Sequence, residues 1–518
     1  MVKYLDNNSG FNQWMSSQQA QQKPSRFGRF FWWMILFLFA WWIMGAWFKP
    51  QNTEVVATQP VTIEQSNVTK QNINSDEISL DVQGLRISNI ILDKHKKDSK
   101  SDEKISLLNA ENNFIEMGYV SPDTQIPNVN TNWKQNSDSM SWNNGAGIGF
   151  TRKISVDGYV ITISDLIKNN SAREISVAPY ANIVRSAGDK MSSVVDSGGM
   201  VYANSKLDYT SWNKLDKKSV AYSTVSGSFG FADQYWETIV SVDINDQTIS
   251  LKKSGDLYFS QTSAAPIKIA ARSEKEIKTY VFAGPRMSNL LNSAADKIPG
   301  INKTMDYGWF WFFAQPMLWL INWLNWLVGN YGVAIILMTL ILRILIWPLT
   351  RKSYVSTMKM QSMQPELQRV QKLYANDKAR LQIEMMKVYQ SHKTSPMSGC
   401  LPMLIQIPIF FALYKALLIS VPMRSANFLW VSDLAAMDPY FILPILMGAT
   451  MWLQQYLQTP QTSNNSNDAL ASTQRVMKWL PVLFTIMFAW MPAGLVLYWT
   501  VSNIFGIGQM MWLKHKSK

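Results

Sequence analysis

The chain has very few of the residues that hold metals or perform nucleophilic catalysis. It contains one cysteine, Cys400, and three histidines, His95, His392 and His515, among 518 residues. A single cysteine excludes an intramolecular disulfide and a metal cluster built on cysteines. The histidines are far apart in the sequence, so we expect neither a histidine metal site nor Ser–His catalysis. The sequence therefore predicts no catalytic residue, no metal site and no cofactor.

Negative charge is scarce in the apolar parts of the chain. The sequence has 49 Lys and Arg against 36 Asp and Glu, a net charge of +13. Residues 49–306 carry 28 basic and 29 acidic side chains, which leaves 21 basic and 7 acidic side chains for the other 260 residues. A nucleic-acid-binding protein would instead concentrate its positive charge on a folded polar module. The distribution argues against nucleic acid as a partner and favours a membrane protein with basic loops on one side of the bilayer.

Six apolar segments are predicted to cross a bilayer, which takes about 20 residues. The weakest is 476–491, which is short, but without it the basic tail would lie outside. The first, 28–48, follows Lys23, Arg26 and Arg29, so we place the N-terminus, residues 1–27, in the cytosol. A cleaved signal peptide is the alternative for 28–48, but the segment is long, rich in Trp and without a small-x-small cleavage site. The other five predicted spans are 331–350, 400–420, 440–458, 476–491 and 493–513.

The charges of the loops between the spans test this topology. Residues 351–399 hold nine Lys and Arg against three acidic residues, and the tail 514–518 holds three lysines. The loop 421–439 holds one Arg and two Asp. Because basic residues are enriched in cytosolic loops, we place 351–399, the loop 459–475 and the tail in the cytosol, and 421–439 outside. The prediction is a multi-pass protein with both termini in the cytosol and a large outer domain over 49–306.

The outer segment has the pattern of β-strands. Runs such as YVITISD (159–165) and TIVSVDI (238–244) alternate polar and apolar residues and are bounded by Asn, Gly and Asp. This pattern predicts half-buried strands of a β-sandwich. A glycine-rich stretch, 143–149, precedes a strand-like run rather than a helix, which favours a turn over a phosphate-binding loop. We find no candidate site in this domain.

The segment 307–329 is rich in Trp and follows the outer domain. Trp319, Trp323 and Trp326 share one face of a helix, and the opposite side carries two asparagines. An apolar stripe with a thin polar face predicts an amphipathic helix lying in the outer membrane interface. A further transmembrane span is the alternative, but it would place the nine basic residues of 351–399 outside the cell.

The segment 351–399 has helical periodicity. We expect a hairpin of two helices of about 20 and 13 residues with a turn at 375–377, where Asp377 caps the second helix. A structural hairpin and a docking arm for a partner or an emerging chain both remain open. The apolar residues expected to face each other are Met358, Leu367, Val370 and Leu373 from the first helix and Leu381, Met385 and Val388 from the second.

One charged residue lies well inside a predicted span. Arg343 is seven residues from the cytosolic end of 331–350, roughly 10 Å deep. A charge in lipid is costly, which makes Arg343 a functional candidate, although its long side chain could also reach the interface. Lys415 lies near the outer end of its span, where such an interfacial position is the simpler interpretation.

No Asp or Glu occurs in the five later spans, so Arg343 has no predicted ion-pair partner there. The neighbouring polar groups are uncharged: Thr339 lies one helical turn away, and other spans supply Gln406, Tyr498, Ser502 and Asn503. Interhelical hydrogen bonds would explain each of these singly. Together with the unpaired Arg343 they predict a hydrated cavity open to the cytosol.

The missing intramembrane acids and histidines also exclude several membrane functions. An intramembrane aspartyl protease needs two Asp, and a rhomboid-like protease needs a Ser and a His within the membrane. Proton- or sodium-coupled carriers generally use carboxylates there. The five later spans contain no Asp, Glu or His.

Several sequence strings carry a family resemblance. From residue 306 onward the chain resembles the YidC/Oxa/Alb family of membrane protein insertases in its Gram-negative six-span form. The matching strings are DYGWFWFFAQP (306–316), RILIWPLTRKSY (343–354), MQPELQ (363–368), GCLPMLIQIPIFFALYKAL (399–417), DPYFILPILMGATM (438–451) and MPAGLVLYWTVSN (491–503).

The resemblance implies a fold and a set of site residues. It implies a polytopic α-helical membrane protein whose five-helix core forms a groove open to cytosol and lipid, with a periplasmic β-sandwich domain of sugar-mutarotase-like shape. Arg343 matches the groove arginine that receives hydrophilic parts of a nascent membrane protein. Thr339, Gln406 and Tyr498 match groove or substrate-contact positions, and Ser502 lies near them. Trp499 departs from the pattern, because relatives often have a tyrosine there and the hydroxyl is lost.

The resulting hypothesis is a non-enzymatic insertase of the bacterial inner membrane. The implied partners are nascent membrane proteins, the lipid bilayer, the Sec translocon and, through the cytosolic loops, the ribosome. A solute carrier or channel is the first alternative, but it predicts internal repeats and paired charges, and neither is present. A membrane-anchored enzyme with its active site on 49–306 is the second.

Overall fold

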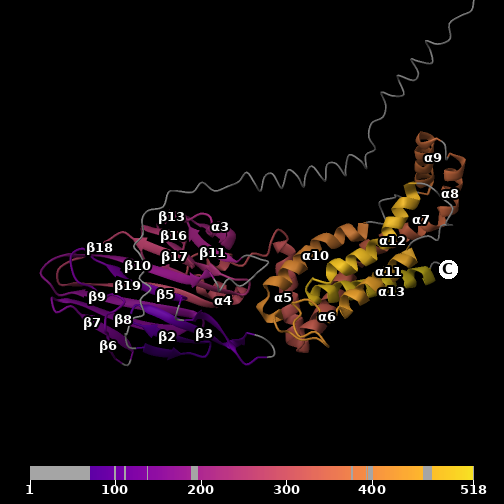
Figure 1. Cartoon of the computed structure of the whole chain (residues 1–518). Helices are drawn as coiled ribbons and strands as arrows, with labels where there is room; N and C mark the ends of the chain where they lie inside the picture. Colours follow the sequence, from indigo (N-terminus) through magenta and orange to yellow (C-terminus); the bar gives the residue numbers. More distant parts are fainter. Residues whose placement is uncertain are drawn as a thin grey trace, which may run out of the picture. The chain divides into compact units, whose positions relative to one another are not determined.

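The computed structural model describes residues 70–97, 101–109, 112–136, 138–187, 197–374, 377–392, 394, 401–458 and 469–516. The predicted span 28–48 and the N-terminal residues 1–27 lie outside these ranges. Strands occupy the described chain up to Pro285, and the long helices follow it (Figure 1).

The strands form two antiparallel sheets. The first has the order β1-β2-β3-β5-β10-β17-β16-β13, with β4 beside β3 and β18 beside β10, and the second has the order β12-β11-β14-β15-β19-β9-β8-β7-β6. The strands of the first sheet are β1 (Lys70–Asn74), β2 (Ile78–Gln83), β3 (Arg86–Lys96), β4 (Lys104–Asn109), β5 (Phe114–Val120), β10 (Ile175–Ser186), β13 (Val220–Thr224), β16 (Gln247–Ser254), β17 (Leu257–Ala264) and β18 (Ile267–Ile269). Those of the second are β6 (Lys134–Gln135), β7 (Ser139–Asn143), β8 (Ile148–Asp157), β9 (Val160–Asn169), β11 (Gly198–Ala203), β12 (Lys206–Ser211), β14 (Gly227–Ala232), β15 (Trp236–Val242) and β19 (Ser273–Pro285).

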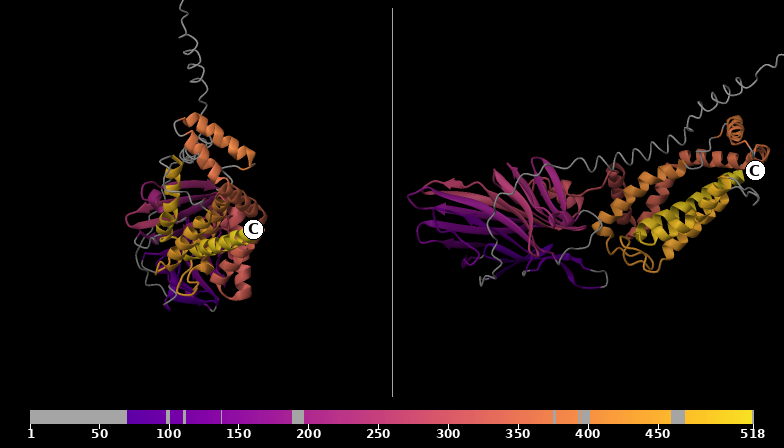
Figure 2. Two further views of the ribbon diagram at one scale, coloured as in Figure 1. Left: turned by 90° about the vertical axis from the view of Figure 1, so that its right-hand side faces the viewer. Right: turned by 45° about the horizontal axis from the view of Figure 1, so that its top comes forward.

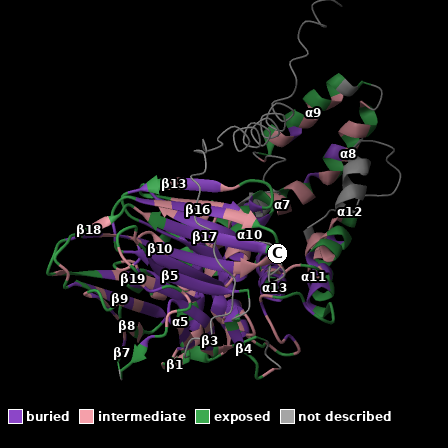
Figure 3. Ribbon diagram, turned by 60° about the vertical axis from the view of Figure 1, so that its left-hand side comes forward, coloured by how far each residue is buried: buried purple, intermediate pink, exposed green. Residues whose placement is uncertain are grey.

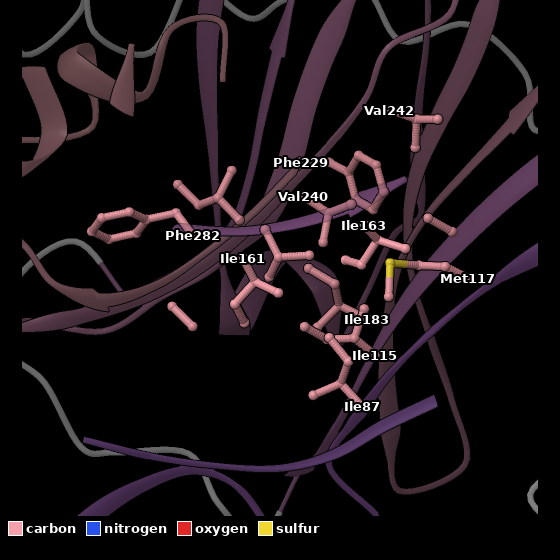
Figure 4. Close-up of a cluster of buried hydrophobic side chains, with 14 of the residues drawn as sticks. Ile87, Ile115, Met117, Ile161, Ile163, Ile183, Phe229, Val240, Val242 and Phe282 are labelled. Atoms are coloured by element: carbon pink, nitrogen blue, oxygen red, sulfur yellow. The ribbon is translucent and has the colours of Figure 1, made fainter. Parts of the chain in front are cut away.

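The two sheets bury one apolar core between them, which confirms the predicted β-sandwich. Ile161 and Ile163 of β9 meet Ile115 of β5 and Ile183 of β10 there (Figure 4). Because side chains alternate between the faces of a strand, every second residue of such a run contributes to the core. Apolar burial of this kind is the main favourable term in folding.

Four short helical segments occur in loops among the strands and the longer helices of the described chain. They are α3 (Trp212–Leu215), α4 (Ser288–Ala294), η2 (Ile301–Lys303) and η3 (Val421–Met423). The longer helices are α5 (Trp311–Val328), α6 (Tyr331–Leu345), α7 (Trp347–Ser362), α8 (Gln364–Leu373), α9 (Lys378–Ser391), α10 (Leu401–Ile419), α11 (Ile442–Gln458), α12 (Ala469–Phe488) and α13 (Ala493–Lys516).

The helix α13 is central to the packing of the longer helices. It packs on α6, α10 and α11, while α5 packs on α6 and α10, and α12 packs on α11 (Figure 2). Their buried residues form one apolar cluster that is separate from the core of the sandwich. Exposed residues run along α9 and α12 (Figure 3).

The helix predicted over 331–350 is broken. The helix α6 ends at Leu345, and α7 starts at Trp347 at an angle of 67° to it. Pro348 in the first turn of α7 explains the break, because proline has no N–H to donate and its ring clashes with the carbonyl four residues earlier. The bent pair α6 and α7 is apolar and long enough together to cross a bilayer, whereas no single helix in the described residues is.

Two other helices differ from the expectation. The first helix of the predicted hairpin is interrupted at Met363, before Pro365, and gives α7 and α8. The helix α12 begins at Ala469, inside the predicted loop 459–475, and continues through Pro481. Residues 459–468 of that loop lie outside the described chain.

The predicted cap of the second hairpin helix is confirmed. The side chain of Asp377 accepts a hydrogen bond from the backbone N–H of Arg380 at the start of α9. The hairpin core contains Met363, Leu367 and Val388, whereas Leu373, expected in this core, is 66% exposed. The hairpin core is therefore smaller than predicted.

The helix α5 turns its tryptophans outward. Trp319, Trp323 and Trp326 are exposed, and Ile321 and Leu324 face the helices α6 and α10. The predicted aromatic stripe is thus available to surroundings other than the protein core.

Candidate functional site

Arg343 is held by a neutral partner near the end of α6. Its Nε donates a hydrogen bond to Oγ of Ser502 on α13, with 2.7 Å between the two atoms. The arginine is only 8% exposed. None of the described carboxylates lies within ion-pair distance of its guanidinium. The cluster around Arg343, called the Arg343 cluster below, therefore contains a buried positive charge that no acidic side chain of the described chain neutralises.

A third helix joins this cluster through Tyr498. The amide Nε2 of Gln406 on α10 donates to Oη of Tyr498 on α13, with 2.5 Å between the atoms. Tyr498 lies one helical turn before Ser502, and the charge of Arg343 acts on its hydroxyl. The structure thus brings four of the six predicted site residues together from three helices: Arg343, Gln406, Tyr498 and Ser502.

The remaining polar candidates take part in helix packing. Thr339 is fully buried, and its hydroxyl donates to the carbonyl of Ile335 on the same helix. Asn503 donates through Nδ2 to the carbonyl of Met447 and to Oγ1 of Thr450 on α11. These bonds satisfy the polar groups within the protein, as interhelical hydrogen bonds commonly do.

Trp499 points into a group of aromatic rings. Its ring centroid lies 5.7 Å from that of Phe410, 5.9 Å from that of Phe484 and 5.1 Å from that of Phe488. These rings come from α10 and α12. The structure does not bring Trp499 to Arg343, and its indole adds apolar packing area to this group of rings.

Lys415 forms an ion pair with Asp306, with 3.3 Å between Nζ and Oδ2. Asp306 precedes α5, so the lysine contributes to the contact between α10 and the start of α5. The Arg343 cluster does not include this pair.

The structure also shows polar residues that the sequence argument missed. Gln509 lies on α13, seven residues after Ser502, and is 4% exposed. Tyr354 of α7 is similarly buried. The charge of Arg343 acts on the Tyr354 hydroxyl as well. Gln509 could have been found from its spacing, because it shares a helix face with Tyr498 and Ser502. Tyr354 could not, because only the bend between α6 and α7 brings it back toward Arg343.

The chemistry of the cluster suits transient binding of polar groups. Arg343 uses only Nε in hydrogen bonding within the described residues, so its remaining N–H groups can donate to a carboxylate, a carbonyl or water. Across the described chain, no group of three or more His, Cys, Asp or Glu side chains could hold a metal ion.

Two family models match the chain. Residues 71–320 match the model described as the YidC periplasmic domain, and residues 323–518 match the model described as the 60Kd inner membrane protein. Two proteins named membrane protein insertase YidC are similar over most of their length. The one from Rickettsia conorii is 33% identical and covers 88% of this chain and 89% of its own. The one from Granulibacter bethesdensis is 30% identical and covers 91% of each chain.

A solved structure is also similar, the active YidC insertase with its first transmembrane domain resolved. It is 20% identical, covers 85% of this chain and 93% of its own, and gives a TM-score of 0.38.

Proposed function

The chain belongs to the YidC family of membrane protein insertases, and from this premise we propose that the Arg343 cluster is its substrate groove. As an insertase it acts on nascent membrane proteins at the inner membrane, and it carries a periplasmic β-sandwich domain. The groove takes the hydrophilic flank of a nascent protein from the cytosol, and the adjoining apolar segment passes into lipid.

The observation that carries this proposal is the bond between Arg343 and Ser502. A buried guanidinium with a hydroxyl partner keeps its charge, and it attracts an acidic or polar flank more strongly than a neutralised ion pair would. Reaching Arg343 shortens the apolar barrier that the flank must cross. Transfer of the apolar segment into lipid then supplies the driving force, so no nucleotide hydrolysis by this chain is required.

Exposed apolar residues support a lipid environment for the helical part. Trp452, Leu453, Trp479 and Ile486 of α11 and α12 are all exposed on the described chain. Contiguous exposed apolar residues of this kind mark membrane or protein interaction sites.

The finer topology belongs to the proposal. We infer six spans, both termini in the cytosol and the β-sandwich in the periplasm, on the strength of the basic residues in 351–399 and in the tail. Labelling of single cysteines with a membrane-impermeant reagent from the periplasmic side tests this. In a chain with Cys400→Ser, Ser425→Cys should react and Arg351→Cys should not, and the reverse pattern would contradict the topology.

We propose that the protein is not an enzyme and that it works alone or with the Sec translocon, and with ribosomes that contact its cytosolic loops. The basic hairpin of α8 and α9 is suited to the last of these contacts, because ribosomal RNA is negatively charged. Co-purification of stalled ribosomes with the intact chain, compared with a chain lacking residues 364–391, tests the ribosome contact.

Charge reversal tests the groove. Cells depleted of the native protein are complemented with Arg343→Glu, and the matched control is Arg351→Glu at an exposed position on α7. We expect Arg343→Glu to abolish insertion of small membrane substrates and Arg351→Glu to leave most of it. A third variant lacking residues 60–290 should lose less activity than Arg343→Glu. Full activity of Arg343→Glu together with failure of the deletion variant would overturn the proposal in favour of a function in the outer domain.

A further inference from the structure

Among the described residues of the helical part, Gln509 is a buried side chain whose two polar atoms both lack a partner. Its amide oxygen and its amide nitrogen are both buried, and neither has a hydrogen-bond partner among the described residues. Gln406 and Asn503, the other buried amides of these helices, both donate hydrogen bonds. A buried amide without partners is costly, so its presence calls for an explanation.

Gln509 continues the polar face of α13 beyond the Arg343 cluster. At 100° per residue, Tyr498, Ser502 and Gln509 fall within about 40° of one another around the helix. Gln509 lies seven residues beyond Ser502, about 10 Å further along the axis toward the cytosolic end of the proposed topology. The three side chains therefore form one polar line along α13.

Tyr354 and Gln454 add polar groups from two other helices. A Cβ on Gly506 of α13 would lie 3.0 Å from Oη of Tyr354 and 3.1 Å from Nε2 of Gln454, so the glycine makes room for both. The Tyr354 hydroxyl is buried, and the Gln454 side chain is its hydrogen-bonding neighbour. The helices α7, α11 and α13 thus place a second group of polar side chains around Gly506, and Gln509 adds an amide that no described residue satisfies.

We propose that Gln509, three residues beyond Gly506 on α13, is a second binding station of the groove, which holds the peptide backbone of the entering chain. This inference rests on the proposed function. A glutamine amide has one acceptor group and one donor group, and a peptide unit has the complementary pair. Arg343 has donors only, so it selects carboxylates and carbonyls. The two stations therefore have different preferences, since Gln509 binds backbone whatever the sequence and Arg343 favours an acidic flank.

If Gln509 had an ordinary structural role, Gln509→Leu would destabilise the helical part. The unsatisfied amide predicts the opposite. Replacing an unsatisfied buried amide by an apolar side chain of similar shape removes a desolvation cost, so Gln509→Leu should not destabilise the helical part. If the amide exists to bind substrate, the same variant should lose activity. We therefore expect Gln509→Leu to keep or raise the midpoint of thermal unfolding and to slow insertion about tenfold, the equivalent of one hydrogen bond to a buried group.

The dependence on the substrate flank separates the two stations. Two substrates are compared that differ only in an acidic or a neutral flank of equal length. Gln509→Leu should slow both to the same extent, whereas Arg343→Gln should slow the acidic substrate more. Unchanged insertion of both substrates by Gln509→Leu would overturn the inference.

Disulfide cross-linking to a stalled substrate tests contact directly. In the full-length chain with Cys400→Ser, single cysteines are introduced as Ser502→Cys, Gln509→Cys and, as control, Met511→Cys, which replaces a side chain that is 60% exposed. We expect cross-links to a cysteine in the hydrophilic flank from positions 502 and 509 and not from 511. Cross-links from 502 without any from 509 would overturn this inference alone and would assign the Gln509 amide to bound water. An absence of cross-links from both positions would overturn the proposed groove as well.

Discussion

Arg343 of α6 and Ser502 of α13 are joined by a hydrogen bond of 2.7 Å in which a buried cation meets a neutral hydroxyl. The serine orients the guanidinium through Nε without cancelling its charge. An acidic side chain at the same place would pair with the arginine and compete with the substrate. In the proposed groove, this choice of partner preserves the attraction for polar flanks.

Removing the serine hydroxyl should impair insertion without removing the charge. In Ser502→Ala the Nε–H of Arg343 loses its acceptor, at a cost of about 1–3 kcal/mol if no water replaces it. We expect slower insertion of a substrate with an acidic flank, but less loss than in Arg343→Gln. The control is Thr500→Val, because Thr500 is equally buried and, among the described residues, its hydroxyl bonds only the Val496 carbonyl of its own helix. Equal activity of the two variants would contradict a role for Ser502 in holding Arg343.

Two glycines of α13 should respond to alanine in opposite ways. At Gly506 a new methyl group would press against Tyr354 and Gln454, whereas at Gly508 it would meet no atom within 4 Å. Gly508→Ala should be neutral or stabilising by up to about 1 kcal/mol, because alanine favours the helix. Gly506→Ala should lower the unfolding midpoint and slow insertion. Measurement of both properties on the purified variants checks this, and similar behaviour of the two would show that the space beside Gly506 has no importance.

Asp438 should be a strong stabilising residue at the start of α11. Its carboxylate is almost fully buried and accepts hydrogen bonds from the backbone of Leu443 and Tyr440 and from Nε1 of Trp430. Loss of a cap and of a buried acceptor predicts that Asp438→Ala costs about 1–3 kcal/mol. Asp438→Asn should cost less because one oxygen remains. Tryptophan fluorescence during unfolding measures the effect. Asp433→Ala, which removes a single local bond to Ala435, is the control, and an equal effect there would count against the cap.

Glu237 should make the stability of the β-sandwich depend on pH. Burial raises the pKa of this carboxyl to about 7, although Arg286 and Thr304 act in the other direction. The folded state therefore holds a proton that the unfolded state has released between about pH 4.5 and pH 7, and the stability conferred by this group falls as pH rises through that window. Hydrogen exchange of β15 in the intact chain at pH 5 and pH 7 should show this decline. In Glu237→Gln the decline should be smaller, and an unchanged profile would exclude Glu237 as its source.

The spacing of polar and apolar residues predicted much of this architecture. Prolines account for most of the differences between the predicted and the observed helices. Alternating runs such as 159–165 became strands of the sandwich, and Asp377 caps α9 as its position suggested. Pro348 and Pro365 divide segments whose apolar content alone favours continuous helices. The apolar content of a segment therefore does not show where a proline breaks its helix.

The candidate site could be predicted only in part. Arg343 was found because a charge in an apolar run is costly wherever the helix lies. Its bond to Ser502 depends on the rotation of α6 against α13, which one sequence does not determine. The position of Trp499 depends on the rings of α10 and α12 in the same way. Tyr354 stands in a segment that looked cytosolic, and its relation to Arg343 follows from a change of chain direction.

The bend at Ile346 sets a constraint on chain length. The ring of Pro348 fixes where the bend occurs in the sequence, and Tyr354 follows six residues later on α7. Adding or deleting one residue between them would rotate the tyrosine by about 100° around the helix and shift it by about 1.5 Å. Substitutions between 349 and 353 can keep the ring beside Gly506, but no single insertion or deletion can. This stretch therefore has a fixed length, and length variation among functional variants should fall elsewhere in residues 351–399.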